Sequence, residues 1–288
     1  MTLLQAVVDG LLTGGLYALM AAGLALIFGV LRVLNFAHGE FIMLGMYAAV
    51  VLYTATGIDP YAFTFLIAAI IFVLGVVFSR IFLERLPHGN MDAQLLLTLG
   101  ISYIAQNVIL LGFGATPKSL NLSYSSRLWE VGGLYISQAS VFATGISLTT
   151  MFLLYLVLGR TPMGRALRAT ADDHEAASAV GVNVRKVRTL TFGLGVALAS
   201  VAGVSLSTFR PASPTSGQTF LLLMFVAIVL GGLGSIEGAV VGALIVGVTQ
   251  AVAGAVLPLQ LQNTVVFSML LIILLIRPQG LFAVSRRV

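Results

Sequence analysis

Long apolar stretches recur from one end of this 288-residue chain to the other, and they constrain its fold more than any other feature. A helix needs roughly 20 residues to cross a hydrocarbon core of about 30 Å. The stretches that reach or approach this length are 5–31, 38–56, 61–83, 93–114, 139–159, 188–209, 219–235, 238–257 and 262–277. The strict alternation of a membrane β-barrel is absent, and lipid offers no partners to an open backbone. The sequence therefore predicts one all-α domain, residues 1–288, folded as a polytopic transmembrane helical bundle.

The composition excludes several classes of protein. Only 9% of the residues are charged and 59% are hydrophobic, which is too few charges to cover a water-soluble surface of this size. The 15 lysines and arginines lie in short segments between apolar stretches, which favours membrane topology signals over nucleic-acid binding. The absence of cysteine and the presence of only three histidines argue against a metal centre. No basic residue precedes Arg32, so the first stretch is expected to remain as a span.

The basic residues also predict an orientation. If nine spans cross and the 160–188 segment is cytoplasmic, the N-terminus lies outside and the C-terminus inside, with 12 basic residues inside and three outside. The inside set is Arg32, Arg80, Arg85, six residues between 160 and 188, Arg277, Arg286 and Arg287, and the outside set is Lys118, Arg127 and Arg210. The glycines between 231 and 238 leave eight spans open, because they could break one re-entrant unit instead of joining two helices.

Small residues four positions apart recur within the apolar stretches. Gly10 with Gly14, Ala199 with Gly203, and Gly238 with Gly242 follow this spacing. Small residues at this spacing let helix backbones approach closely in a membrane bundle. The sequence predicts close helix packing at these positions.

The 160–188 segment is the most informative break. Its alanines and leucines favour helix, Asp172 and Asp173 can cap a second short helix, and Gly181 can end it. We expect a short helix, a turn and another short helix. Such structure in a cytoplasmic loop predicts a docking partner, and the alternative is a solvated amphipathic loop.

This segment resembles a known family of transporters. Residues 175–181 (EAASAVG) match the Glu-Ala-Ala-three-residues-Gly signature of ATP-binding-cassette importer permeases, whose coupling helix fits a groove on the nucleotide-binding subunit. Four further segments are similar to, and in the order of, motifs of the branched-chain amino acid permeases: NFAHGE at 35–40, RTPMGRALRA at 160–169, GGLGSIEGA at 231–239 and RPQGLF at 277–282. The resemblance covers essentially the whole chain. Glu237 departs from it, standing where the family more often has proline.

The resemblance implies an assembly in the bacterial inner membrane. Its expected members are a second, similar permease subunit, two ATP-binding subunits and a periplasmic or lipid-anchored solute-binding protein. ATP and Mg would be used by the partners, and this chain, which has no phosphate-binding loop, would bind no cofactor. The residues expected to couple to the ATPase are Arg165, Arg168, Asp172, Asp173, Glu175, Ala176, Ala177 and Gly181. The solute stays open among aliphatic amino acids, urea, amides and aromatic acids, and so does pairing with a distinct permease or with itself.

Polar residues inside or between the spans are candidates for a solute pathway. Asn35, His38 and Glu40 fall together at the first break, where they could share a polar network. They could line a gate near the cytoplasmic end, or they could hydrogen-bond the broken backbone there. Gln106 and Asn107 lie within an apolar span, so they are expected either to line the pathway or to join helices by hydrogen bonds.

The predicted outer loops offer docking candidates for a binding protein, with a plain solvated loop as the alternative. These candidates are Arg127, Arg210, Thr215 and Gln218. No serine has a base at a suitable spacing, so the sequence predicts no enzyme.

A stand-alone channel or secondary carrier is the competing function. A carrier is expected to bury a carboxylate near mid-span, whereas Glu40, Glu84 and Glu237 all fall at predicted breaks. A passive pore gives no reason for the structured 160–188 segment. An importer permease is therefore favoured.

Overall fold

The computed structural model describes residues 2–85, 91–258, 261–277 and 279–282. Its helices are α1 Thr2–Leu31, α2 His38–Thr56, α3 Thr64–Ile81, α4 Met91–Phe113, α5 Gln138–Arg160, α6 Pro162–Asp172, α7 His174–Ala179, α8 Val184–Ser207, α9 Ser216–Gly231, α10 Ile236–Val256 and α11 Gln262–Ile276. Short 3-10 turns, Pro60–Phe63 and Leu83–Arg85, flank α3. Arg286 and Arg287 of the charge count, and Pro278 of the 277–282 motif, lie outside the described residues.

Each predicted apolar stretch forms a helix, which confirms the all-α bundle. In the described residues, seven helices are long and apolar enough to cross a membrane, and α9 and α11 are shorter, with 16 and 15 residues. This agrees with the expected eight or nine spans.

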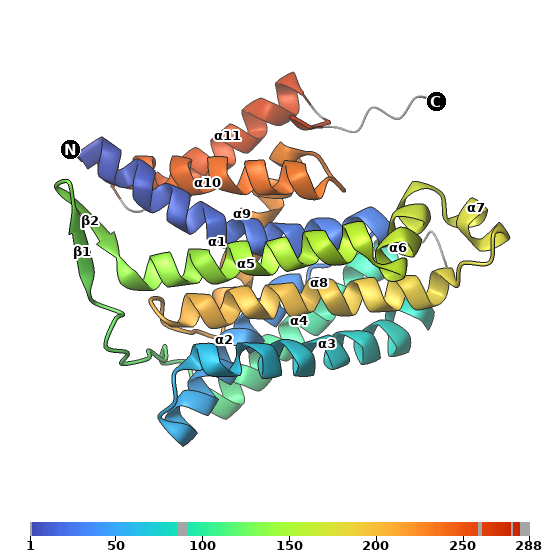
Figure 1. The fold of residues 1–288 in the computed structure, drawn as a ribbon, viewed down its shortest axis with the longest axis horizontal. Helices are drawn as coiled ribbons and strands as arrows, with labels where there is room; N and C mark the ends of the chain where they lie inside the picture. Colours follow the sequence, from blue (N-terminus) through green and yellow to red (C-terminus); the bar gives the residue numbers. More distant parts are fainter. Residues whose placement is uncertain (1, 86–90, 259–260, 278, 283–288) are drawn as a thin grey trace.

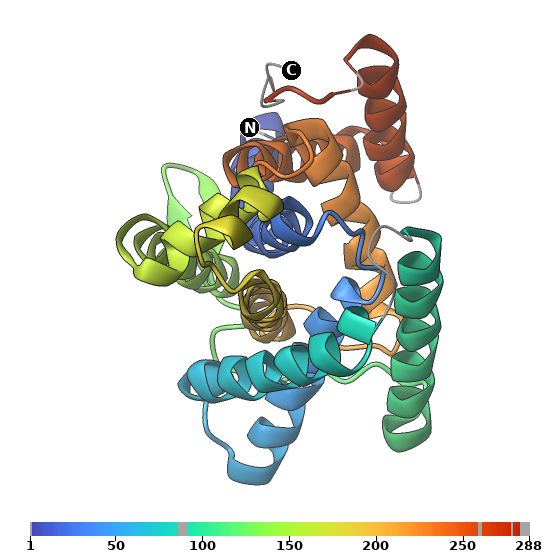
Figure 2. The ribbon, with the colours of Figure 1, turned by 90° about the vertical axis from the view of Figure 1, so that its right-hand side faces the viewer.

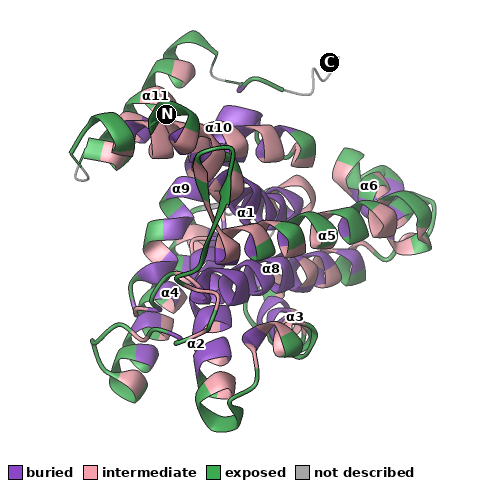
Figure 3. Ribbon diagram, turned by 60° about the vertical axis from the view of Figure 1, so that its left-hand side comes forward, coloured by how far each residue is buried: buried purple, intermediate pink, exposed green. Residues whose placement is uncertain are grey.

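The bundle has a buried centre and an apolar outer surface. Most of the apolar length of α1 and α8 is buried, 89% in each case, against 17% for α5. Figure 3 shows this contrast, and Figure 2 shows α4 and α11 at the periphery on one side. Phe65, Leu111 and Leu275 on outer helices are each at least 85% exposed. Such a surface suits lipid, because the membrane core favours apolar side chains.

The two ends of the bundle differ in structure. At one end, which we call the hairpin end, lie the N-terminus and a β-hairpin; at the other, the loop end, lie α6 and α7 (Figure 1). Connections are tied together at the hairpin end, where the Lys118 and Ala212 backbones exchange hydrogen bonds of 2.8 Å. At the loop end, Arg185 forms an ion pair with Glu84.

The hairpin is absent from the all-α prediction. Strands β1 Leu128–Val131 and β2 Leu134–Ser137 pair antiparallel around Gly132 and Gly133, whose φ angles are 61° and 80°. Two positive φ angles define the type I′ turn that suits a two-residue hairpin. The Gly-Gly pair between Val131 and Leu134 is the sequence signal that could have revealed it.

The small-residue spacings mark close helix packing, as predicted. A Cβ at Gly10 would lie 2.6 Å from Val248 Cα, and one at Gly14 would lie 2.9 Å from Leu244 Cα, so α1 and α10 cross in backbone contact. A Cβ at Gly203 of α8 would lie 2.2 Å from the carbonyl oxygen of Ile42 in α2.

The glycines after α9 form a turn between two helices, α9 and α10. Gly232 and Gly234 have φ angles of 108° and 87°, and the Ser235 hydroxyl caps α10 by accepting from the Gly238 amide at 3.0 Å. The C-terminal segment docks there, because the amides of Leu281 and Phe282 donate to the carbonyls of Leu230 and Gly231.

Candidate functional site

Two helices begin in the interior of the bundle, where the first turn of α2 lies beside the middle of α4 and the C-terminal half of α1. After α1 ends, Arg32 adopts a left-handed conformation (φ 55°), and the chain turns back, placing His38 against Gly23 of α1. A Cβ at Gly39 would lie only 2.1 Å from the Gly217 carbonyl oxygen, so the first turns of α2 and α9 meet. Helix N-termini inside a membrane bundle are typical of transporter solute sites.

A buried carboxylate occupies this meeting point. Glu40, in the first turn of α2, is 2% exposed and accepts hydrogen bonds from Ser102 at 2.7 Å and from Gln106 at 2.8 Å. Both donors lie on α4. They belong to a buried polar stripe in which every fourth residue is polar: Gln94, Thr98, Ser102 and Gln106. The positive end of the α2 dipole favours the carboxylate at this place.

The depth of this cluster corrects two expectations. Asn35, His38 and Glu40 do lie together, but at mid-depth and not near the cytoplasmic end, because the 33–37 segment returns into the bundle. Within the described residues, no hydrogen bond joins His38 to Glu40. The sequence argument against a carrier also assumed that no carboxylate is buried near the middle of the bundle. Glu40 is such a carboxylate.

The two adjacent amides of α4 have different surroundings. Gln106 is buried and donates to Glu40 and to the Ser102 hydroxyl, so it joins α4 to α2. Asn107 is exposed and donates to the Tyr103 carbonyl in its own helix, at 2.8 Å. Of the two amides, only Gln106 belongs to the interior cluster.

The 160–188 segment forms the expected pair of short helices and projects from the loop end (Figure 1). Thr161 caps α6 by accepting from the Gly164 amide at 3.0 Å, and Pro162 takes the first helical position. Asp173, not Asp172, caps α7, accepting from the amides of Glu175 at 2.9 Å and Ala176 at 3.1 Å. Those amide hydrogen bonds lower the pKa of the Asp173 carboxyl. Gly181 follows α7 with a φ of 88°.

Two of the coupling candidates already make contacts within this chain, and the others are exposed. Arg168 folds back, donating to the Leu158 carbonyl of α5, and Ala177 is only 3% exposed. The remaining candidates present their side chains or backbone to the surroundings: Arg165, Asp172, Asp173, Glu175, Ala176 and Gly181. Val180, which the sequence argument did not single out, is 79% exposed beside them. This exposed surface on α6, α7 and residues 180–181 is hereafter the coupling face.

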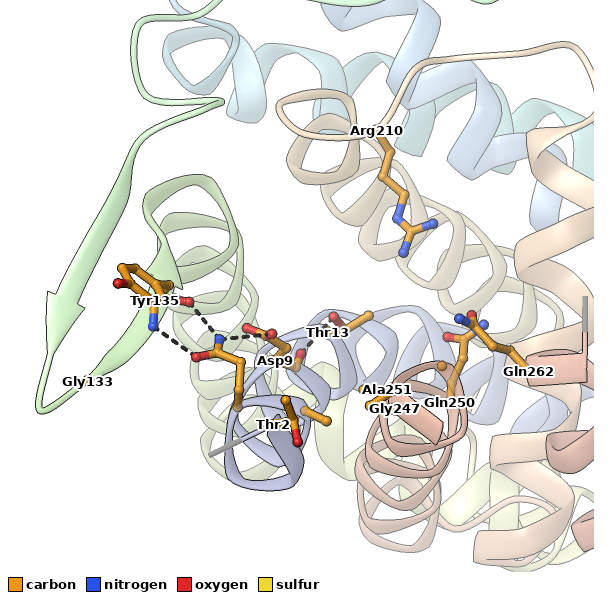
Figure 4. Close-up of a pocket in the computed structure, with 14 residues that line it drawn as sticks. Thr2, Asp9, Thr13, Gly133, Tyr135, Arg210, Gly247, Gln250, Ala251 and Gln262 are labelled. Carbon is orange, nitrogen blue, oxygen red and sulfur yellow. Dashed lines mark hydrogen bonds between the residues drawn. The ribbon is translucent and has the colours of Figure 1, made fainter. Parts of the chain in front are cut away.

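The docking candidates lie in different places. Arg127 is exposed just before β1 at the hairpin end. Thr215 is exposed at the start of α9, and Gln218 lies in the first turn of α9 beside Gly217, which packs against Glu40. Arg210 lines a cavity of about 610 Å³ between α1, α10 and the hairpin (Figure 4).

The arrangement suits passage of a solute more than bond chemistry. In the described part of the chain, no group of three or more His, Cys, Asp or Glu side chains could hold a metal ion. A buried polar cluster with helix N-termini inside an apolar bundle is instead typical of membrane transport proteins. The fold and site thus define a helical membrane permease.

Comparison with known proteins gives the family. The family model described as "Branched-chain amino acid transport system / permease component" matches residues 6–276, and the chain belongs to this family. It is therefore a permease subunit of an ATP-binding-cassette importer and not an enzyme, and ATP hydrolysis resides in partner subunits. The family, not the carboxylate argument, sets the stand-alone carrier aside.

Individual relatives cover nearly the whole chain. The permease protein BraD of a high-affinity branched-chain amino acid transport system of Pseudomonas aeruginosa is 34% identical, over 96% of this chain and 95% of its own. The corresponding LivH protein of Escherichia coli K12 is 33% identical, over 96% and 94%. The solved structure of PsaBC from Streptococcus pneumoniae in complex with Fab has the same fold at 13% identity, with a TM-score of 0.51 over 94% of this chain and 91% of that one.

Proposed function

We propose that this chain forms part of the path by which a branched-chain or related amino acid enters a bacterial cell. BraD and LivH, whose similarity extends over nearly the whole chain, are named as branched-chain amino acid permeases, and this supports the solute class. In this proposal the chain lies in the inner membrane with the hairpin end outside. Its partners are a second, similar permease, two ATP-binding subunits, which use ATP and Mg, and a solute-binding protein; the chain itself binds no cofactor.

The coupling face is the observation that carries the proposal. Two capped helices hold it away from the bundle at one end, and the ion pair of Glu84 with Arg185 ties its base to the turn after α3. A partner that pushes on α7 would therefore act on α3 and α8 together. Because α8 is buried along the centre of the bundle, its displacement would reach the mid-depth cluster.

The mid-depth cluster is the proposed gate. Glu40 holds α2 to α4 through Ser102 and Gln106, and α9 begins beside it, so a shift of α8 or α4 would part the interior N-termini. Asn35 and His38 complete the buried polar group.

Co-purification tests the assembly. The tagged chain is expressed with its neighbouring genes, extracted in detergent, and the recovered proteins are identified by mass spectrometry. We expect two ATP-binding subunits and a second permease. Recovery of this chain alone, stable and monodisperse, would overturn the proposed assembly.

A further inference from the structure

The cavity at the hairpin end is a chamber whose lining combines charged, amide and small apolar residues. Its volume, about 610 Å³, lies within the range of small-ligand sites. Gln5 fixes one wall: its amide donates to the Tyr135 carbonyl at 2.6 Å and to Asp9 at 3.0 Å, and its oxygen accepts from the Tyr135 amide. Gln250 fixes the floor by accepting from the Tyr17 hydroxyl at 2.9 Å. These bonds hold the chamber open between α1, α10 and the hairpin.

Two side chains of opposite charge line this chamber, and they do not form an ion pair with each other. Arg210 reaches into it from the connection after α8, and Asp9 lies across from it on α1 (Figure 4). In the described part of the chain, the Arg210 guanidinium has no hydrogen bond or ion pair, and the Asp9 carboxylate accepts a side-chain hydrogen bond only from the neutral amide of Gln5. Arg210 is exposed and Asp9 is half-buried, so both charged groups are accessible to a ligand that enters the chamber.

Part of the chamber wall is made of small apolar residues. Gly247, Ala251, Gly254 and Ala255 of α10 and Ala6 of α1 supply this wall. A solute with a carboxylate, an ammonium group and an aliphatic side chain matches the three surfaces, because arginine binds carboxylates bidentately and a carboxylate pairs with ammonium.

We propose that this chamber is a transit site for a zwitterionic aliphatic amino acid, with Arg210 binding the solute carboxylate and Asp9 its ammonium group. The proposal rests on the proposed function and adds a place where the permease itself recognises the solute. It also reassigns Arg210 from docking a binding protein to contacting the solute.

Thiol labelling of the assembled complex tests the site. The chain has no cysteine, so Ala255→Cys places one thiol on this chain, exposed at the chamber wall. We expect an anionic methanethiosulfonate to modify it faster, relative to free thiol, than a cationic one. Arg210→Gln should lower that preference several-fold and Asp9→Asn should raise it, whereas Lys118→Gln, which removes a charge outside the chamber, should leave it unchanged.

Protection by solute is the second measurement. Leucine should slow the modification, leucinamide, which lacks the carboxylate, should not, and Arg210→Gln should abolish the protection. In proteoliposomes holding the complete complex, Arg210→Gln should lower leucine uptake at least about tenfold, and Arg210→Lys should retain part of it. A complex that takes up no amino acid would overturn the proposed function. A thiol whose reaction ignores both Arg210 and leucine would overturn this site alone.

Discussion

Glu40 is a carboxylate inside an apolar bundle, and among the residues that the structure describes only the neutral side chains of Ser102 and Gln106 donate hydrogen bonds to it. A buried charge with incomplete hydrogen bonding costs free energy, so each donor matters to the stability of the bundle. Its position in the first turn of α2 and its closeness to the start of α9 offset part of that cost. The residue thus links three helices at the proposed gate.

Adjacent amides of α4 allow a matched test of this link. Gln106→Leu removes a donor from Glu40 and should lower the free energy of unfolding by about 1–3 kcal/mol. Asn107→Leu changes an exposed side chain bonded within its own helix and should stay within about 0.5 kcal/mol. Thermal unfolding in detergent measures both. Equal losses in the two variants would contradict the role given to Gln106.

Asp173 gives a pH-dependent prediction at the coupling face. Hydrogen bonds from the Ala176 and Glu175 amides lower its folded-state pKa, so its contribution to capping is fully present above its ordinary pKa of about 3.9 and is lost as pH falls through the lower folded value. Asp173→Ala should therefore speed hydrogen exchange in residues 174–179 several-fold at pH 7, as measured by mass spectrometry. Asp173→Asn, which still caps, should exchange like the unmodified chain. Protection that declines already between pH 8 and 6 would contradict this assignment.

The sequence pointed to several of these residues but not to their depth. Gln106 stood out, together with Asn107, as an amide in an apolar span. Asp172 and Asp173 were both candidates for the cap, and the structure distinguishes them. The depth of Glu40 depends on the left-handed turn at Arg32 and on the return of residues 33–37 beside α1. Arginine rarely adopts a left-handed conformation, so the sequence gives little local sign of this turn, and the segment after α1 was interpreted as a loop near the cytoplasmic end.

Around the short helix α7, substitution by glutamate should have different effects at a buried and at an exposed position. Val180→Glu alters an exposed position of the coupling face and should release the ATP-binding subunits while the permease stays folded. Ala177→Glu, which the sequence alone would also offer as an uncoupling variant, forces a charge into a position only 3% exposed and should unfold the segment. Co-purification measures release, and proteolysis at 170–182 measures unfolding. Full retention of the ATP-binding subunits by Val180→Glu would rule out this face as their contact.

The packing of α9 on α10 makes a second prediction for an element. A Cβ at Gly242 would lie 2.1 Å from the Ala227 carbonyl oxygen, so Gly242→Ala should destabilise the protein by about 1–3 kcal/mol. Gly112→Ala on α4 meets nothing within 4 Å and should be neutral or slightly stabilising, because alanine favours helix. Thermal melting compares the two. A smaller loss for Gly242→Ala than for Gly112→Ala would contradict the close packing.

Elements were predictable where one physical requirement dominated. The nine helices that match predicted stretches could be located because a membrane span needs a long apolar stretch. The short helices α6 and α7 could be located from their capping residues. The hairpin was missed because its exposed strands carry no buried alternating face, and only Gly132 and Gly133 mark it. The interior start of α9 was missed because its short apolar sequence looks like that of a full span.

Across the whole molecule, the three parts to which we assign functions follow one another along the bundle. The chamber with Arg210 and Asp9 opens at the hairpin end, the Glu40 cluster lies at mid-depth, and the coupling face projects from the loop end. The central helices α1 and α8 are the most deeply buried of the apolar helices. Such an order suits a protein in which a partner acting at one end controls a gate that solute reaches from the other.

Uptake by the reconstituted complex tests the central claim most directly. The chain, its co-purified partners and the solute-binding protein are placed in proteoliposomes, and accumulation of radiolabelled leucine is followed with ATP, without ATP, and with Val180→Glu. We predict accumulation against a gradient that requires ATP and is lost in the variant. Accumulation that continues without ATP, or no leucine uptake by a fully assembled complex, would contradict the account.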